Sequence, residues 1–260
     1  MKMIKIGPAG IGGAKEAEQY LEEFHTNKLE AAEVTFTYSN YLTKEDAIKI
    51  GKIAKKLGIT LSIHGSYYIN LNSEDKSKIE KSKERILGAC KIAEYLEAKY
   101  VVFHAGYYGK KSKEETYEKI KEEISDLQKT LKKNKWKVKL APETTGKNSV
   151  FGDLDETLQL VKDTGCHFCI DFAHLKARNQ GETNFKEHIS KIKHFSHVHC
   201  HYSGINYGPK GERNHIPIEK DETRELIKEL KKQKVNCTLI CEAPNTIKDS
   251  IEMKKILISI

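Results

Sequence analysis

Short apolar runs rich in β-branched residues alternate with charged, helix-like segments along this 260-residue sequence. Such runs are typical of strands that are buried on both faces. The segments between them carry apolar residues at three- and four-residue spacing, which predicts amphipathic helices. Eight strand candidates follow one another: IKIG at 4–7, EVTF at 33–36, TLSIH at 60–64, YVVFH at 100–104, VKLAPE at 138–143, FCID at 168–171, FSHVHCH at 195–201 and CTLICE at 237–242.

Eight alternations of strand and helix predict how the chain closes. When eight parallel strands are joined by right-handed helical crossovers, a closed barrel is favoured over an open sheet. Gly58 and Gly165 follow helix-like segments and suit the position where a helix ends before the next strand. No linker rich in Pro, Gly or Ser divides the sequence. We therefore predict an α/β fold, a (β/α)8 TIM barrel, forming a single domain over residues 1–260.

Composition constrains the setting of the protein. The formal net charge is +8, which would favour binding of a polyanionic partner, although most lysines are expected on solvated helix faces. The N-terminal residues enter a strand pattern directly and lack the apolar stretch of a signal peptide or a membrane span. We predict a cytoplasmic protein with no membrane and no obligate protein partner. Its six cysteines are expected to be reduced and structural, since Cys166 and Cys169 lack the second pair of a zinc ribbon.

Metal-competent side chains close six of the eight strand candidates. In a parallel barrel the carboxyl ends of all strands lie on one face, so residues distant in sequence would meet there. A single histidine is more often structural, but ionisable groups at the ends of several buried strands need partners, and shared cations are the simplest ones. Imidazole with carboxylate suits zinc, manganese or iron, and the size of the set predicts two or three ions. The candidates are His64, His104, Glu143, Asp171, His199 and Glu242, with His174 and His215 in loops.

Other residues of similar chemistry are expected to be structural. The glycine cluster GPAGIGG at 7–13 lacks the spacing of a phosphate-binding loop and is expected to be a barrel loop before a helix. The remaining histidines lie in helix-like segments or early in strands, away from the predicted catalytic face. They are His25, His167, His188, His194 and His197.

Five motifs stand in order along the chain: SIHGSYYINL at 62–71, VVFHAG at 101–106, PETTGKNSVFG at 142–152, CIDFAHLKA at 169–177 and CEAPN at 241–245. Together they resemble the endonuclease IV family of abasic-site endonucleases, within the xylose-isomerase-like barrel superfamily. The resemblance covers essentially the whole chain. It implies that Glu242 or Glu143 orients the attacking water and that Tyr67 lies beside the abasic nucleotide. It also implies three zinc ions, held by His64, His104 and Glu143, by Glu143, Asp171, His199 and Glu242, and by His174 and His215.

Three departures from the family pattern change these expectations. Arg213 stands where the family has an aspartate for its third zinc, so Glu212 is the expected replacement, after a one-residue bulge. The segment after the seventh strand candidate reads HCHY, which makes His201 an added ligand or a phosphate contact in substrate binding. The loop TYSNYLT at 37–43 lacks the basic residue that family members insert into DNA.

These observations predict a metal-dependent phosphodiester hydrolase that cleaves double-stranded DNA 5′ to abasic sites, with a di- or trinuclear Zn²⁺ centre; Mn²⁺ or Fe²⁺ could occupy some positions. A sugar isomerase or epimerase on the same barrel is the alternative, because a fold does not fix a function. It would need fewer ligands than the sequence offers. A metal-stabilised nucleic-acid-binding protein without catalysis is a third hypothesis.

Overall fold

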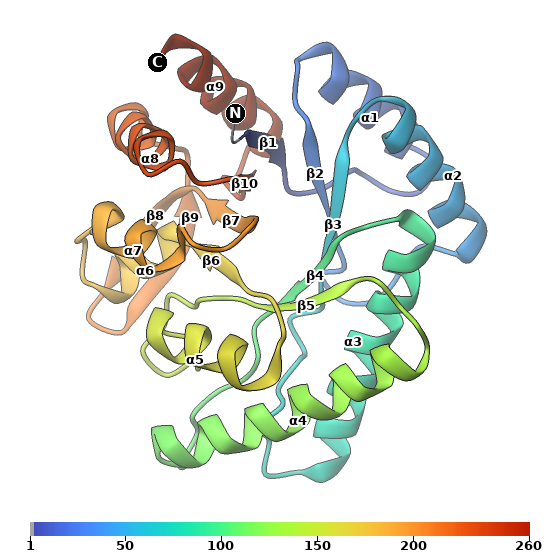
Figure 1. Cartoon of the computed structure of the whole chain (residues 1–260), viewed down its shortest axis with the longest axis vertical. Coiled ribbons are helices and arrows are strands. Elements are labelled where there is room, and N and C mark those ends of the chain that lie inside the picture. Colours follow the sequence, from blue (N-terminus) through green and yellow to red (C-terminus); the bar gives the residue numbers. More distant parts are fainter. Residues whose placement is uncertain (1–2) are drawn as a thin grey trace.

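The computed structural model describes residues 3–260 and shows a ring of parallel strands surrounded by helices (Figure 1). The predicted (β/α)8 barrel is confirmed, and all eight predicted strands are present. They are β1 (Ile4–Pro8), β2 (Ala31–Thr35), β3 (Thr60–His64), β4 (Tyr100–Phe103), β5 (Lys139–Pro142), β6 (Cys169–Asp171), β7 (Val198–Tyr202) and β10 (Cys237–Cys241).

The barrel consists of two four-stranded sheets that meet at two joints. One sheet has the order β1-β10-β7-β6 and the other β2-β3-β4-β5, with all neighbours parallel. Parallel bridges between Ala9 and Glu33 and between Glu143 and Cys169 close the ring. Closure places the carboxyl ends of the eight strands on the same face.

Helices cover the outside of the ring (Figure 1). Three of them begin with reciprocal capping boxes, such as Thr43 with Asp46, which satisfy free backbone donors at the helix start. Gly165 ends α5 with φ 70°, and Gly58 has φ 73° just after α2, as the sequence predicts. The helices are α1 (Ala17–Thr26), α2 (Lys44–Lys56), α3 (Lys76–Leu96), α4 (Lys113–Lys133), α5 (Leu154–Thr164), α6 (Phe172–Arg178), α7 (Phe185–Ile192), α8 (Lys220–Lys232) and α9 (Thr246–Ser259).

The core lies between the strands and the helices. Side chains such as Ile50 of α2, Ile120 of α4 and Leu226 of α8 are buried against the ring. All six cysteines are buried and free. Within residues 3–260, no helix combines the length and apolar character needed to cross a membrane.

A two-stranded antiparallel hairpin interrupts the regular alternation after β7. Its strands are β8 (Gly204–Gly208) and β9 (Gly211–Ile216), and it packs beside α6 outside the ring (Figure 1). The sequence predicts only a turn-rich loop here. The hairpin carries Glu212 and His215, so it adds two candidate ligands to the barrel rim.

Candidate metal centre

The carboxyl ends of six strands bring acidic and imidazole groups together on one face of the barrel. Three overlapping groups have ligand atoms within 4.8 Å of one another, and a fourth lies at the hairpin. The groups at this face are His64, His104 and Glu143; His64, His201 and Glu242; Glu143, Asp171, His201 and Glu242; and His174, Glu212 and His215.

Glu143 lies at the middle of this arrangement, directly after β5. Its Oε2 lies 3.1 Å from Nε2 of His64 and 2.9 Å from Nε2 of His104, while its Oε1 lies 3.0 Å from Nδ1 of His201. Burial opposes ionisation, but the imidazoles of His201 and His104 hold the pKa of Glu143 well below its usual value. Each oxygen therefore faces a different cluster, which is the arrangement of a bridging carboxylate.

Hydrogen bonds on the outer side of the rings fix two of these imidazoles. Nδ1 of His64 lies 2.9 Å from the carbonyl oxygen of Gly65, and Nδ1 of His174 lies 2.9 Å from that of Thr144. A ring whose Nδ1–H donates to a carbonyl presents its Nε2 lone pair to the centre. Burial disfavours the charged ring of both residues, yet nearby carboxylates, Glu143 among them, raise each pKa to about 9.

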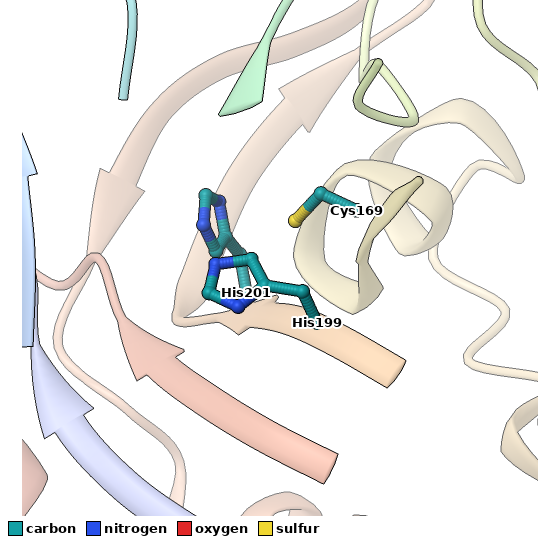
Figure 2. A group of neighbouring side chains, drawn as sticks. All are labelled: Cys169, His199 and His201. Atoms are coloured by element: carbon teal, nitrogen blue, oxygen red, sulfur yellow. The ribbon is translucent and has the colours of Figure 1, made fainter. Parts of the chain in front are cut away.

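His201, rather than His199, joins the group of Glu143, Asp171 and Glu242. The strand register separates His199 from the group in which it was expected: His201 pairs with Asp171 across β6 and β7, whereas His199 pairs with Cys169 one layer deeper and forms a further metal-competent group with Cys169 and His201. Nε2 of His199 instead contacts Oε2 of Glu33 at 2.9 Å. Figure 2 shows the deeper layer, in which the Cys169 side chain points toward the two imidazoles. Of the two expectations for His201, an added ligand or a phosphate contact, its full burial among metal-competent groups favours the ligand.

The donor set fits divalent metal ions. Oδ2 of Asp171 is buried and has no hydrogen-bond partner among residues 3–260, and burial raises the pKa of this carboxyl group. Burial also opposes ionisation of Glu242, but His201 lowers its pKa to about 2. A buried carboxylate with a free lone pair, beside further carboxylates and imidazoles, is satisfied by a cation. Oxygen and imidazole donors suit zinc, manganese and iron.

An irregularity in the hairpin places Glu212 in the third cluster. Asn206 pairs with Asn214 but Tyr207 pairs with Glu212, so Arg213 is the extra residue of a bulge. Residues three apart on a regular strand face opposite sides, and the bulge puts Glu212 and His215 on the same side. Nε2 of His174 lies 3.6 Å from Oε2 of Glu212.

Glu33 on β2 is a buried acid that the sequence reasoning does not single out. Its side chain is fully buried, and it accepts hydrogen bonds from Ser62 at 2.7 Å and His199 at 2.9 Å. Burial opposes ionisation, but His201 and His199 hold the pKa of Glu33 well below its usual value. One signal was available, because an acidic residue stands in the otherwise apolar run of β2.

The structure also places the other residues considered in the sequence analysis, namely Tyr67 and the histidines that were expected to be structural. Tyr67 lies in the loop after β3 and is 66% exposed. His167 and His197 lie at the other end of the barrel strands, where the ring of His197 is parallel to that of Tyr100 and the ring of His167 is tilted against it. His25, His188 and His194 lie outside the metal-competent groups of residues 3–260. Of the glycine cluster at 7–13, the first two residues belong to β1, and the rest lies in the segment 9–16 that connects β1 to α1.

Comparison with known proteins identifies related chains. The uncharacterised protein MJ0133 of Methanocaldococcus jannaschii is 35% identical over 97% of this chain and 96% of its own length. The probable endonuclease 4 of Thermoplasma volcanium is 31% identical over 59% of this chain, which matches only 54% of that relative. The predicted resemblance to the endonuclease IV family is confirmed.

Solved structures share the fold. Endonuclease IV from Thermus thermophilus superposes with a TM-score of 0.71 over 98% of this chain and 97% of that chain, at 20% identity. A D-tagatose 3-epimerase-like protein gives 0.74 over 100% and 96%, at 19% identity. The family model described as xylose isomerase-like TIM barrel matches residues 21–257. The chain therefore belongs to the xylose isomerase-like TIM barrel family.

Proposed function

We propose that this protein is a zinc-dependent endonuclease that cleaves double-stranded DNA 5′ to abasic sites, in base-excision repair. The observation that supports this proposal most strongly is the number and position of the metal-competent groups. Glu143 faces two clusters at once, and the hairpin adds a third cluster of His174, Glu212 and His215. Mononuclear sites need three or four protein ligands, and this rim offers more than twice that number. The similarity to the Thermoplasma volcanium relative supports the same proposal.

The ions would lower the pKa of water and neutralise phosphate oxygens. The residues of the chain orient the groups around them. Glu242 and Glu143 would hold and orient the attacking water, because both carboxylates lie at the rim and both contact His201. His64 and His104 would fix the second oxygen of Glu143. Zinc is proposed for two or three positions, with Mn²⁺ or Fe²⁺ as substitutes.

Exposed aromatic side chains beside the centre support a nucleic-acid substrate. Tyr38, Tyr67 and Tyr68 are 70%, 66% and 58% exposed, and the rings of Tyr38 and Tyr68 lie 6.3 Å apart. Aromatic rings at a metal-containing rim can stack on bases or fill the space of a missing base. The loop of 37–43 lacks a basic residue, so these rings would carry the insertion into the duplex. Double-stranded DNA with abasic sites is the proposed partner, and no obligate protein partner is proposed.

A metal-dependent sugar isomerase or epimerase is the second candidate. The observation that favours it is the central group of Glu143, Asp171, His201 and Glu242, which alone could hold one ion for a small substrate. This candidate leaves His174, Glu212 and His215 without a role.

Because all six cysteines are free and buried, we also propose a reducing, cytoplasmic setting.

Glu242→Gln tests the proposal. Elemental analysis of the intact protein should give two or three equivalents of metal, and a duplex with one abasic site should be cut on its 5′ side. The variant keeps the size of the side chain but loses a charged rim group, so cleavage should fall by roughly 100-fold or more.

Glu123→Gln is the matched control, since Glu123 is a buried acid on α4 that pairs with Lys83 and Lys119 far from the rim. It should cleave like the intact protein. Inert abasic DNA together with turnover of a ketose would favour the isomerase. Less than one equivalent of metal would contradict both candidates.

A further inference from the structure

His201 faces the central carboxylates through a different nitrogen from His64 and His104, and its Nδ1 lies closer to Glu143 than that of His174, which is 3.5 Å away. His64 and His104 approach Glu143 with Nε2, and His174 approaches Glu212 with Nε2. His201 instead presents Nδ1, which lies 3.0 Å from Glu143 and 3.4 Å from Glu242. Its Nε2 points away from the rim, toward the interior of the barrel.

The outer partner of His201 is also different. The rings of His64 and His174 are held by backbone carbonyl groups, but Nε2 of His201 lies in ion-pair contact with Oε1 of Glu33, at 2.9 Å. That carboxylate is fully buried and comes from β2, across the barrel from β7. A carboxylate is a stronger acceptor than a carbonyl group, and its charge makes the opposite nitrogen of the ring a better electron donor.

Two further contacts keep Glu33 in place. Ser62 donates to Oε2 at 2.7 Å, and Nε2 of His199 lies 2.9 Å from the same oxygen. Oε1 is thereby left for His201: in the part of the chain that the structure describes, neither Oε1 nor Nε2 of His201 makes a hydrogen bond, and they face each other in the 2.9 Å ion-pair contact. Through this contact, His199 helps to hold the residue that faces Nε2 of His201.

We propose that Glu33 is a positioning residue of the metal centre: it holds the ring of His201 with Nδ1 toward Glu143 and Glu242, and it would strengthen the binding of an ion that His201, Asp171 and Glu242 would hold. The inference rests on the metal centre of the proposed function. It concerns ion affinity and ligand geometry, which are measured without any DNA substrate.

Glu33→Gln removes the charge and keeps the shape. Zinc competition with a chromophoric chelator should show one site weakened by roughly 10- to 100-fold, the usual effect of losing an outer partner of a ligand. The site of His174, Glu212 and His215 should keep its affinity. Circular dichroism and the thermal midpoint report whether the variant is folded.

Two variants separate positioning from general effects of burial. Glu123→Gln removes a buried carboxylate of α4 and should leave every zinc affinity within twofold of the intact protein. His199→Gln removes one partner of Glu33 and should weaken zinc binding less than Glu33→Gln does. Loss of one zinc equivalent in His199→Gln would make His199 the ligand and overturn the proposal.

The intact protein gives an independent test that needs no folded Glu33 variant. Two-bond proton–nitrogen correlation spectra of the zinc-loaded, ¹⁵N-histidine-labelled protein should contain one imidazole bound through Nδ1 with a protonated Nε2. That signal should be absent from His201→Gln. Coordination of His201 through Nε2, or a folded Glu33→Gln with unchanged zinc affinity, would overturn the inference while leaving the endonuclease proposal standing. An intact protein that binds no zinc would contradict both the inference about Glu33 and the endonuclease proposal.

Discussion

Among single residues, Tyr67 is the proposed contact between the metal centre and a substrate. Its ring lies in the loop after β3 and is mostly exposed, yet it is close enough to the carboxylates of Glu242 and Glu143 for them to contribute to its raised pKa, after burial of the hydroxyl group. A large aromatic side chain with this exposure has little packing to lose. Its position therefore fits the proposed contact with DNA.

Replacement of Tyr67 by Ala should weaken binding of an abasic duplex by about 1–3 kcal/mol, the range found when one stacking ring is removed. Fluorescence anisotropy at fixed salt measures the change, and metal content should stay the same. Tyr67→Phe keeps the ring and should bind like the intact protein. Equal binding by all three proteins would mean that Tyr67 does not touch DNA.

Single residues also show where sequence reasoning stops. His199 and His201 both point into the barrel, because strand side chains alternate, and they differ by about 6.6 Å along β7. The sequence contains both histidines but not the register that pairs His201 with Asp171. Glu33 shows the same limit, since its partners on β3 and β7 are known only when the strands are placed together.

The β8–β9 hairpin determines the third cluster at the scale of elements. The bulge at Arg213 compensates for the extra residue between Glu212 and His215. Glu212→Gln should remove about one equivalent of bound zinc in elemental analysis, because a neutral amide is a poor ligand. Deletion of Arg213 should retain that equivalent, since a regular strand then places the two residues on one face.

Zinc loss in the deletion variant, with its hairpin still folded, would show that the bulge does more than compensate for spacing. Zinc retention in Glu212→Gln would show that Glu212 is not a ligand. Either result is read from the same stoichiometry measurement, with the central group as internal reference.

Elements were predictable to different degrees. The eight barrel strands are apolar runs flanked by amphipathic segments, so their period and composition identify them. The hairpin has polar residues and three glycines among its strands and turn, and its stability comes from packing on α6. Local sequence carries little of that signal. The helix ends at Gly58 and Gly165 were predictable because a left-handed residue is needed there.

For the whole molecule, we expect stability at acid pH to depend on two histidines at the end of the barrel away from the metal centre. Burial lowers the pKa of His167 and His197 to about 4, from an ordinary value of 6.5. Both rings are neutral in the folded and unfolded chains above pH 6.5. Between pH 6.5 and 4 the unfolded chain binds protons that the folded chain does not, so the free energy of unfolding falls as pH falls.

Urea unfolding at pH 7, 6, 5 and 4.5 measures this fall. Both rings are partly exposed, so their joint contribution should be on the order of 1–3 kcal/mol after solvent screening. The double variant His167→Asn, His197→Asn should show a shallower pH dependence over this window. An identical slope would assign the acid sensitivity to other groups.

The closed barrel also explains why one carboxylate can serve two clusters. Glu143 follows β5 at the joint between the two sheets, with one oxygen toward His64 and His104 and the other toward His201. Under the proposed function, two ions at these clusters would share Glu143 and would not load independently: whatever factor the first changes in the affinity of the second must hold in reverse. Titration of the metal-free protein should thus report cooperativity, of either sign, long before any substrate is added.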